Sequence, residues 1–553
     1  MAQRDLVEDI RSQVNAAARR LLSEQDRDAY SPTRGCFDRR YWGWKLVDFP
    51  ESTFQRNVYP LAVLYADPGS EYYHSPALRS AILAGLRYSA GIQHRDGSFD
   101  QAFPNEHSFG ATAFLLYPLF EAFKLAADEA DGDTRSDVEQ CLRRAANFLC
   151  EHGEAHGHIA NHLAGAALSL LVSAEHFGET RYRERVKVIL QIILEHQSPE
   201  GWFLEYEGAD PGYQTLCLYY LAQVYRKIGG EALREALERA VEFIACFVHP
   251  DGTFGGEYGS RRTAIFYPGG LALLSGEFPM ALSVTQAMCR SICAGHTVTL
   301  RDVDTGNLAP LLSNYLCALQ PGVLEEKATA PPLPWAQSQV RRDFPQAGLY
   351  VRGTGRYYAV LGASNGGVLK VFDKPQRRAL WDDGGYVGRL ADGTLVTTQM
   401  TVLDRACTVG EDEITLSADF YRMLHSLPTP FRFVVLRLLN LTVMRSVWLG
   451  NLVKRGLVRL LISGKRRYGV QLRRRVRFEA GRVVVEDRVS KSPGLKVAWL
   501  EFGRRFVGIH MASAGYFEGR QLGQPLPAPR IDVERLNRQN HLDVRVVIEA
   551  ANA

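Results

Sequence analysis

Apolar residues recur at helical spacing throughout the first half of the chain. Apolar positions lie about 3.6 residues apart in the stretches 164–172, 188–194, 216–224 and 240–247. Polar, glycine-containing turns, most of them with an aromatic residue, separate the helices at 43–44, 96–99, 153–157, 200–203, 251–254 and 302–306. These turns recur about every 50 residues, which is room for one helical hairpin per repeat.

Hairpins of this kind stack side by side, and about six of them can close into a ring. We therefore predict an N-terminal α/α toroid of about six helical hairpins. Its turns should build a groove at the end where the inner helices begin.

The pattern changes after Asn314, and the proline-rich stretch 331–334 is typical of a linker. Beyond it come short alternating segments rich in Val, Tyr and Thr, at 348–352, 357–361, 368–372, 394–398, 476–479 and 483–486. These segments predict antiparallel strands of a β-sandwich. The expected organisation is a toroid over 1–325 and a β-sandwich domain over 326–553.

One segment of the second half does not follow the strand pattern. Residues 430–465 are apolar but interrupted at helical spacing by Arg432, Arg437, Arg445, Lys454, Arg455 and Arg459. This predicts a basic amphipathic helical insertion. Two interpretations stay open: the insertion is buried in the β-domain, or it lies on an anionic membrane surface.

Composition narrows the class of protein. The chain has 553 residues, 46% of them hydrophobic, and a net charge of only +4, which does not indicate a nucleic-acid partner. The N-terminus lacks the apolar core of a signal peptide, no long uncharged apolar run predicts a spanning helix, and the nine cysteines show no CxxC pair. We expect a cytoplasmic protein with free thiols, possible peripheral membrane association and no cysteine-based zinc site.

The candidate chemistry lies on two successive turns of the toroid. The first is His156-Gly-His158-Ile-Ala-Asn161-His162, and the second runs from Glu200 through Glu205 to Tyr213 and Gln214. Equivalent turns on neighbouring hairpins face the same groove, so these residues can converge.

Asn161, His162 and Tyr213 suit the removal of a proton next to a carboxylate. Asn and His can hydrogen-bond the carboxylate of a uronic acid while C5 loses its proton, and Tyr can act as base and acid. Loss of the 4-linked group then gives an unsaturated sugar. Structural interpretations remain open as well: His162 as a hydrogen-bonded histidine at a helix start, and Tyr213 as a core aromatic.

The Asn161-His162 pair and the segment 200–214 resemble motifs of the toroid-type polysaccharide lyases of the heparinase II/III kind. The resemblance implies a toroid followed by a β-sandwich, and an enzyme without a cofactor. It also implies that Asn161 binds the uronate carboxylate, His162 is a base or carboxylate ligand, and Tyr213 is the base and acid. Glu205 would position the substrate or the histidine.

Two departures from the family pattern change what we expect. Gln214 follows the tyrosine where the family usually has histidine, and the stretch 362–373 lacks the histidine that the family's β-domain often supplies. We therefore expect no metal, neither structural zinc nor a site built from His152, His156 and His158, and either another acid or a modified reaction.

Other turn residues are candidates for substrate binding, with core packing or a solvated surface as the alternative. Charged and aromatic side chains on the turns can contact an acidic sugar or stack on its ring, and the candidates are Glu205, His107, Arg262, Tyr258, Trp44 and Trp202.

The leading hypothesis is a carbon–oxygen lyase that acts on a uronate-containing oligosaccharide or polysaccharide. A uronyl C5-epimerase acting on a nascent or lipid-linked glycan would use the same residues. A toroid glycoside hydrolase, with paired carboxylates such as Asp210 and Glu257, and a non-catalytic glycan-binding scaffold are the further alternatives.

Overall fold

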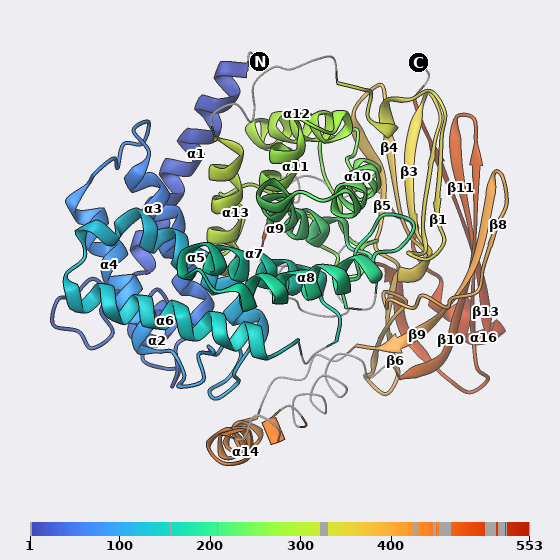
Figure 1. Cartoon of the computed structure of the whole chain (residues 1–553). Helices are drawn as coiled ribbons and strands as arrows, with labels where there is room; N and C mark the ends of the chain where they lie inside the picture. The colour runs from blue at the N-terminus through green and yellow to red at the C-terminus, as the bar shows by residue number, and fades with distance from the viewer. Residues whose placement is uncertain are drawn as a thin grey trace.

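The fold is described from a computed structural model of the chain (Figure 1). The structure describes residues 3–154, 157–206, 208–320, 330–423, 429–445, 449–450, 452, 466–503, 516–517, 526 and 528–551.

A closed inner ring of helices forms the N-terminal part. Each inner helix packs against the next, and the last packs against the first. The inner helices are α3 (Val58–Ala66), α5 (Phe109–Ala126), α7 (Ala160–Phe177), α9 (Pro211–Ile228), α11 (Pro268–Leu274) and α13 (Thr305–Ala318). The outer helices are α1 (Gln3–Glu24), α4 (Pro76–Gly91), α6 (Gly132–Glu151), α8 (Thr180–Glu195), α10 (Glu231–Ala245) and α12 (Pro279–Ala294). The predicted toroid is confirmed.

The inner helices begin at one end of the ring, which we call the turn end. Contacts between the starts of successive helices show this. Ser52 N donates to Asp100 O ahead of α3 and α5, and Ile159 bridges to Glu205 ahead of α7 and α9. Arg56 Nη2 donates to Gly306 O and so joins the starts of α3 and α13.

Side-chain caps fix where several inner helices start. The oxygens of Ser108, Asp210 and Asp304 accept backbone N–H groups in the first turns of α5, α9 and α13. Helix α5 is long and apolar enough to cross a membrane by composition, but 78% of it is buried, as expected of a core helix in the ring. All nine cysteines are free.

The described strands form two antiparallel sheets. The first has the order β1-β2-β3-β4-β5 and consists of β1 (Val340–Phe344), β2 (Leu349–Gly353), β3 (Tyr357–Gly362), β4 (Val368–Asp373) and β5 (Arg378–Asp383). The second has the order β12-β6-β7-β9-β10-β11-β13, with β8 on β9. Its strands are β6 (Tyr386–Leu390), β7 (Leu395–Thr397), β8 (Cys407–Val409), β9 (Glu413–Arg422), β10 (Arg467–Glu479), β11 (Arg482–Lys491), β12 (Val497–Phe502) and β13 (His541–Glu549).

The first sheet is the middle layer of the molecule (Figure 1). Leu349 and Val351 belong to the core of the toroid, whereas Tyr350, between them on β2, packs in the core shared with the second sheet. Both faces are therefore covered, which explains why every position of strands β2, β3 and β4 is buried and most of them are apolar. The β-rich second half is confirmed.

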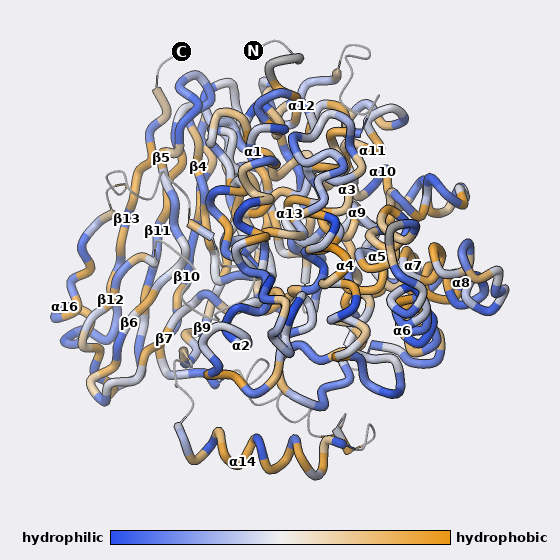
Figure 2. The backbone as a smooth tube through the Cα atoms, turned by 90° about the vertical axis from the view of Figure 1, so that its left-hand side faces the viewer, coloured by the Kyte–Doolittle hydropathy of each residue, from blue (hydrophilic) through white to orange (hydrophobic). Residues whose placement is uncertain are grey.

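Helix α14 (Pro430–Leu441) confirms that the basic segment begins as a helix. It lies at the bottom of Figures 1 and 2, where it contacts the toroid through Asp48 and Asn105. Residues 446–448, 451 and 453–465 of the predicted insertion lie outside the described residues.

Candidate functional site

Strained backbone gathers in the segments that lead into the inner helices. Five non-glycine residues there have positive φ: Lys45, Asn105, His107, Tyr206 and Arg262. Such conformations cost on the order of 1–3 kcal/mol each and cluster at functional sites. The turn end of the ring is therefore where a site is expected.

Asn161 and Glu205 form the buried base of the candidate site. Asn161 Nδ2 donates to Glu205 Oε2 at 3.1 Å, and its backbone N–H donates to Oε1 at 3.0 Å. Both residues are 1% exposed. Asn161 therefore holds Glu205 in place, and its amide is not presented to the surface for a uronate.

Burial raises the pKa of Glu205 to about 8, although the Asn161 N–H and the charge of Arg261 oppose the shift. The side chain is thus a neutral acid at neutral pH. Asn161 Oδ1 has no hydrogen-bond partner among the described residues. Rotation of that amide would let a protonated Glu205 donate to it.

We expect Glu205→Gln to flatten the dependence of stability on pH. The folded protein keeps the Glu205 proton up to about pH 8, whereas the unfolded chain releases it near the ordinary glutamate pKa of 4.5. The folded state then binds more protons, so its free energy of unfolding falls as pH rises between these values, by at most about 1.4 kcal/mol per pH unit.

Urea unfolding of both proteins across this pH window measures the effect. The exposed Glu195→Gln on α8 is the control and should keep the wild-type slope. Equal slopes for wild type and Glu205→Gln would contradict a buried neutral Glu205.

His162 lies in the first turn of α7 and is oriented by a carboxylate. Its Nδ1 is 2.6 Å from Glu154 Oε2, and its ring packs edge-on against Phe114. A Cβ at Gly110 would lie 2.5 Å from the same Nδ1, so the start of α5 needs glycine there. The side chain of His162 remains 18% exposed, with Nε2 as the nitrogen not engaged by Glu154.

Tyr213 is half-buried near the start of α9, beside Arg261 and Tyr206. The Arg261 guanidinium lies 5.3 Å from the Tyr213 ring centroid and 4.0 Å from that of Tyr206, and it hydrogen-bonds Tyr213. Buried Asp210 fixes this arrangement: its carboxylate accepts backbone N–H groups of Tyr213, Arg261 and Thr263 at 2.9, 2.8 and 3.3 Å.

Tyr206 links the two halves of the site. Burial raises the pKa of its phenol to about 12, and the charge of Arg261 opposes the shift. The nearby charges of Tyr213 and Glu154 also raise the pKa of this phenol. The tyrosine pair and the His162–Glu154 pair are therefore close to one another. His162 and Tyr213 therefore lie at the same end of the ring.

Besides Glu205, three more of the predicted substrate-binding residues are buried. Tyr258 is 1% exposed, and its hydroxyl lies 2.8 Å from His249 Nε2. Trp202 is 6% exposed, and its indole N–H donates to Glu200 Oε2. Arg262 is 5% exposed and donates to Gln399 O, which joins the toroid to the β-domain. These side chains pack behind their turns, so a surface role in sugar binding does not hold for them.

The remaining two substrate-binding candidates lie on other turns. His107 contacts Asp96 Oδ2 at 2.7 Å and Ser98 Oγ at 2.8 Å, and its ring lies against that of His94. Trp44 is 70% exposed, in the segment before α3.

The carboxylates considered for hydrolysis have structural partners. Asp210 is fully buried and bound by backbone N–H groups, and Glu257 is 2.6 Å from Lys370 Nζ at the boundary with the β-domain. Within the described part of the chain, no three His, Cys, Asp or Glu side chains are grouped as metal ligands. His156 lies outside that part.

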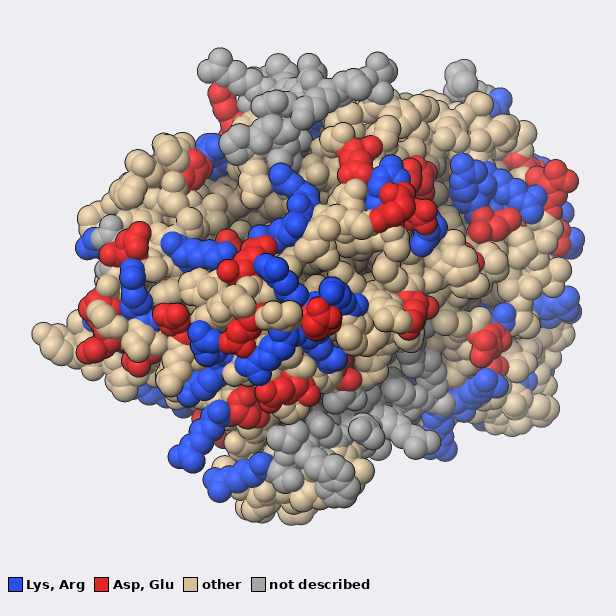
Figure 3. Space-filling model, viewed as in Figure 1, with Lys and Arg blue, Asp and Glu red and all other residues tan. Residues whose placement is uncertain are grey.

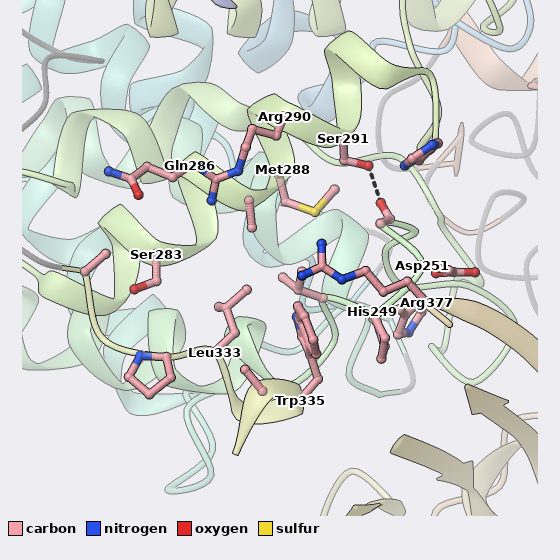
Figure 4. A pocket seen from close by; sticks show the side chains of 18 of the residues that line it. His249, Asp251, Ser283, Gln286, Met288, Arg290, Ser291, Leu333, Trp335 and Arg377 are labelled. Carbon is pink, nitrogen blue, oxygen red and sulfur yellow. Dashed lines mark hydrogen bonds between the residues drawn. The ribbon is translucent and has the colours of Figure 1, made fainter. Parts of the chain in front are cut away.

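A pocket on another flank of the toroid contains none of the predicted site residues. Helix α12, the turn 250–252, the segment 330–336 and Arg377 line it (Figure 4). Among the residues that line it, His249 contacts the buried Tyr258, with 2.8 Å between His249 Nε2 and the tyrosine hydroxyl.

Sequence reasoning did not single out Glu154 and Tyr206. Glu154 stands eight positions before His162, on the far side of the turn, and only the folded turn brings the two together. Tyr206 is next to the predicted Glu205, and its left-handed backbone, unusual for a tyrosine, gives no signal in the sequence.

Residues 52–271 match the family model of the ulvan lyase N-terminal domain, which covers less than half of the 553 residues. This match contains α3 to α10, Arg261 and the start of α11. No curated protein matches the chain in sequence.

The fold is similar to those of two solved polysaccharide lyases. A xanthan lyase from Paenibacillus has a TM-score of 0.52 at 12% identity, over 89% of this chain and 46% of that chain. The chondroitin AC lyase of Streptomyces coelicolor A3, solved with chondroitin sulphate, has a TM-score of 0.53 at 15% identity, over 89% of this chain and 67% of that chain. The chain thus spans about half the length of the xanthan lyase. The predicted resemblance to polysaccharide lyases built from a toroid and a β-domain is confirmed.

Proposed function

We propose that the protein is a polysaccharide lyase that cleaves a uronate-containing glycan by removing the C5 proton and eliminating the 4-linked group. The observation that carries this proposal is the convergence of a phenol, a guanidinium and a carboxylate-oriented imidazole at the turn end of the ring. Tyr213, Arg261 and His162 are each partly exposed there, above the buried Asn161–Glu205 pair.

Tyr213 is the proton-transfer group of this proposal. Reacting as the phenolate, it takes the C5 proton, the electrons of the C5–H bond form the C4–C5 double bond, and the C4–O bond breaks with its electrons on the leaving oxygen. The same phenol then donates its proton to the leaving oxygen, so one residue acts as base and acid. The adjacent Arg261 cation stabilises the negative charge on the phenolic oxygen during the transfer.

Arg261 and His162 are the candidates for holding the uronate carboxylate. A guanidinium binds a carboxylate through two parallel hydrogen bonds, and charge on the carboxylate increases as C5 loses its proton. Glu154 fixes the His162 ring and leaves Nε2 for the substrate. Asn161, which the family resemblance implied as a direct carboxylate ligand, acts here as a positioning residue for Glu205.

The substrate class follows from the charge of the site and from the fold relatives. The chondroitin AC lyase was solved with an acidic polymer, chondroitin sulphate. A cation on the open side of the site and a neutral acid at its base suit a substrate with a carboxylate. We therefore propose an acidic, glycosaminoglycan-like polysaccharide.

Incubation with a panel of uronate-containing oligosaccharides in heavy water tests the proposal. Elimination should produce the ultraviolet absorbance of a C4–C5 double bond together with shorter chains. New reducing ends without that absorbance would identify a hydrolase, and deuterium at C5 without shortening would identify an epimerase. Either result, or no reaction on any acidic sugar, would contradict the lyase.

A further inference from the structure

Helix α14 carries its apolar face on the outside of the molecule. Phe431, Val434, Leu438 and Leu441 are 77, 57, 58 and 52% exposed. Their spacing of three, four and three residues places them on one stripe of the helix. A surface helix of a soluble domain normally turns this stripe toward the core, so the orientation here is reversed.

Polar contacts hold the other side of α14 against the protein. Arg437 Nη2 is 2.6 Å from Asp48 Oδ1, Asn105 Nδ2 donates to Asn440 O at 3.1 Å, and Asn440 is fully buried. Both partners precede inner helices, Asp48 before α3 and Asn105 before α5. The helix is therefore attached at the turn end of the ring, where the candidate site lies.

A second chain segment adds exposed apolar side chains beside α14. Trp44 and Leu46 are 70 and 85% exposed, just before Asp48, and Arg437 also lies over the Phe49 ring at 5.6 Å. Two segments nearly 400 residues apart in sequence thus bring exposed apolar side chains to one end of the molecule. Exposed apolar surface on this scale is typical of an interaction site.

The charge pattern identifies the kind of partner. Residues 430–465 contain seven Lys and Arg residues and neither Asp nor Glu. Figure 3 shows α14 at the bottom of the molecule with blue and tan atoms, whereas blue and red alternate over the toroid. Arginine stems can lie along apolar lipid while their guanidinium groups reach the headgroups. At 12 residues, α14 is too short to span a membrane.

We propose that α14, together with the loop that carries Trp44 and Leu46, binds the surface of an anionic lipid membrane. The apolar stripe enters the interface between headgroups and acyl chains, and the exposed Arg432 and Arg445 bind the anionic headgroups. Each cation near such a surface strengthens binding roughly fivefold. The turn end of the ring then faces the membrane, which suits a glycan held at a lipid surface. This inference does not depend on the reaction proposed for the site.

Flotation of the full chain with vesicles tests the surface. Neutral phosphatidylcholine vesicles are compared with vesicles that also contain phosphatidylglycerol, at low and high salt. The wild type should float with the anionic vesicles, and less so at high salt because salt screens the arginines. Failure to float with anionic vesicles at either salt concentration would overturn the proposal.

A matched pair of variants locates the contact. Phe431→Ser with Leu438→Ser should lower the fraction bound by at least about tenfold, because both side chains leave the lipid interface. Val188→Ser with Ile228→Ser removes two partly exposed apolar side chains from the toroid, at 45 and 48% exposure, and should bind like the wild type.

Sedimentation of the free protein separates lipid binding from self-association. The proposal expects the same monomeric or oligomeric state for the wild type and the α14 variant. A wild-type oligomer that the α14 variant loses, or equal flotation of the two α14 forms, would assign the stripe to another role and overturn the lipid surface.

Discussion

Tyr213→Phe should abolish eliminative turnover while the protein stays folded. The substitution removes only the phenolic oxygen of a half-buried side chain, so the packing of α9 is unchanged. General acid–base catalysis contributes roughly a hundredfold to ten-thousandfold to a rate, and here one group serves in both steps. We expect kcat to fall by at least the lower figure, with KM nearly unchanged because the ring and Arg261 still contact the sugar.

The control is the same substitution at the other end of the same helix. Tyr225 donates to Glu277 at 2.8 Å, far along α9 from Asp210, and Tyr225→Phe should retain wild-type kinetics. Ultraviolet absorbance of the unsaturated product reports the rate, and circular dichroism reports folding. Wild-type turnover by Tyr213→Phe would assign Tyr213 to the core instead.

Asp383→Ala should destabilise the β-domain by about 1–3 kcal/mol, because it removes one of the two carboxylates that bind the buried Arg474 and leaves Nη1 without this acceptor. Arg474 on β10 is fully buried. Its Nη1 contacts Asp383 Oδ2 at 2.5 Å, and its Nη2 contacts Asp487 Oδ2 at 2.7 Å. The pair joins the two sheets, since Asp383 ends β5 and Arg474 lies in the second sheet.

Urea unfolding, followed by tryptophan fluorescence, measures this loss. Asp543→Ala is the matched control: it breaks the pair with Arg488 at 2.7 Å, in which the side chains are 61 and 53% exposed, and should cost less than about 1 kcal/mol. A loss for Asp383→Ala no larger than that of the control would show that water or rearrangement compensates Arg474.

The sequence pattern predicted that α14 is a helix, but not how the helix is oriented on the protein. The spacing of cations and apolar residues predicted a basic amphipathic helix, and α14 begins at Pro430. The pattern leaves open which face turns outward, because an apolar stripe suits a core and a membrane equally. Asp48 and Asn105, distant in sequence, bind the polar side and so decide the orientation.

For the candidate site, too, the sequence predicted the location and the structure decided the role of each residue. Turns repeated about every 50 residues place Asn161, His162, Glu205 and Tyr213 on neighbouring hairpins, and the structure brings them to one end of the ring. Burial gave several of these residues roles other than the predicted ones. Asn161 became a support for Glu205, and Trp202 and Tyr258 became core residues, because residue type does not reveal which side of a turn a side chain takes.

Local patterns in the sequence were sufficient to predict the architecture. Apolar residues spaced about 3.6 positions apart predict helices, and the alternation that follows predicts strands. The repetition of the helical hairpins predicts a ring, because each hairpin can bury its apolar face only against its neighbours. Tertiary structure alone decided the Glu154–His162 pair, the position of Arg261 over two tyrosine rings, and the burial of both faces of the first sheet. These features depend on contacts between segments that come together only when the ring closes and the sheet packs against it.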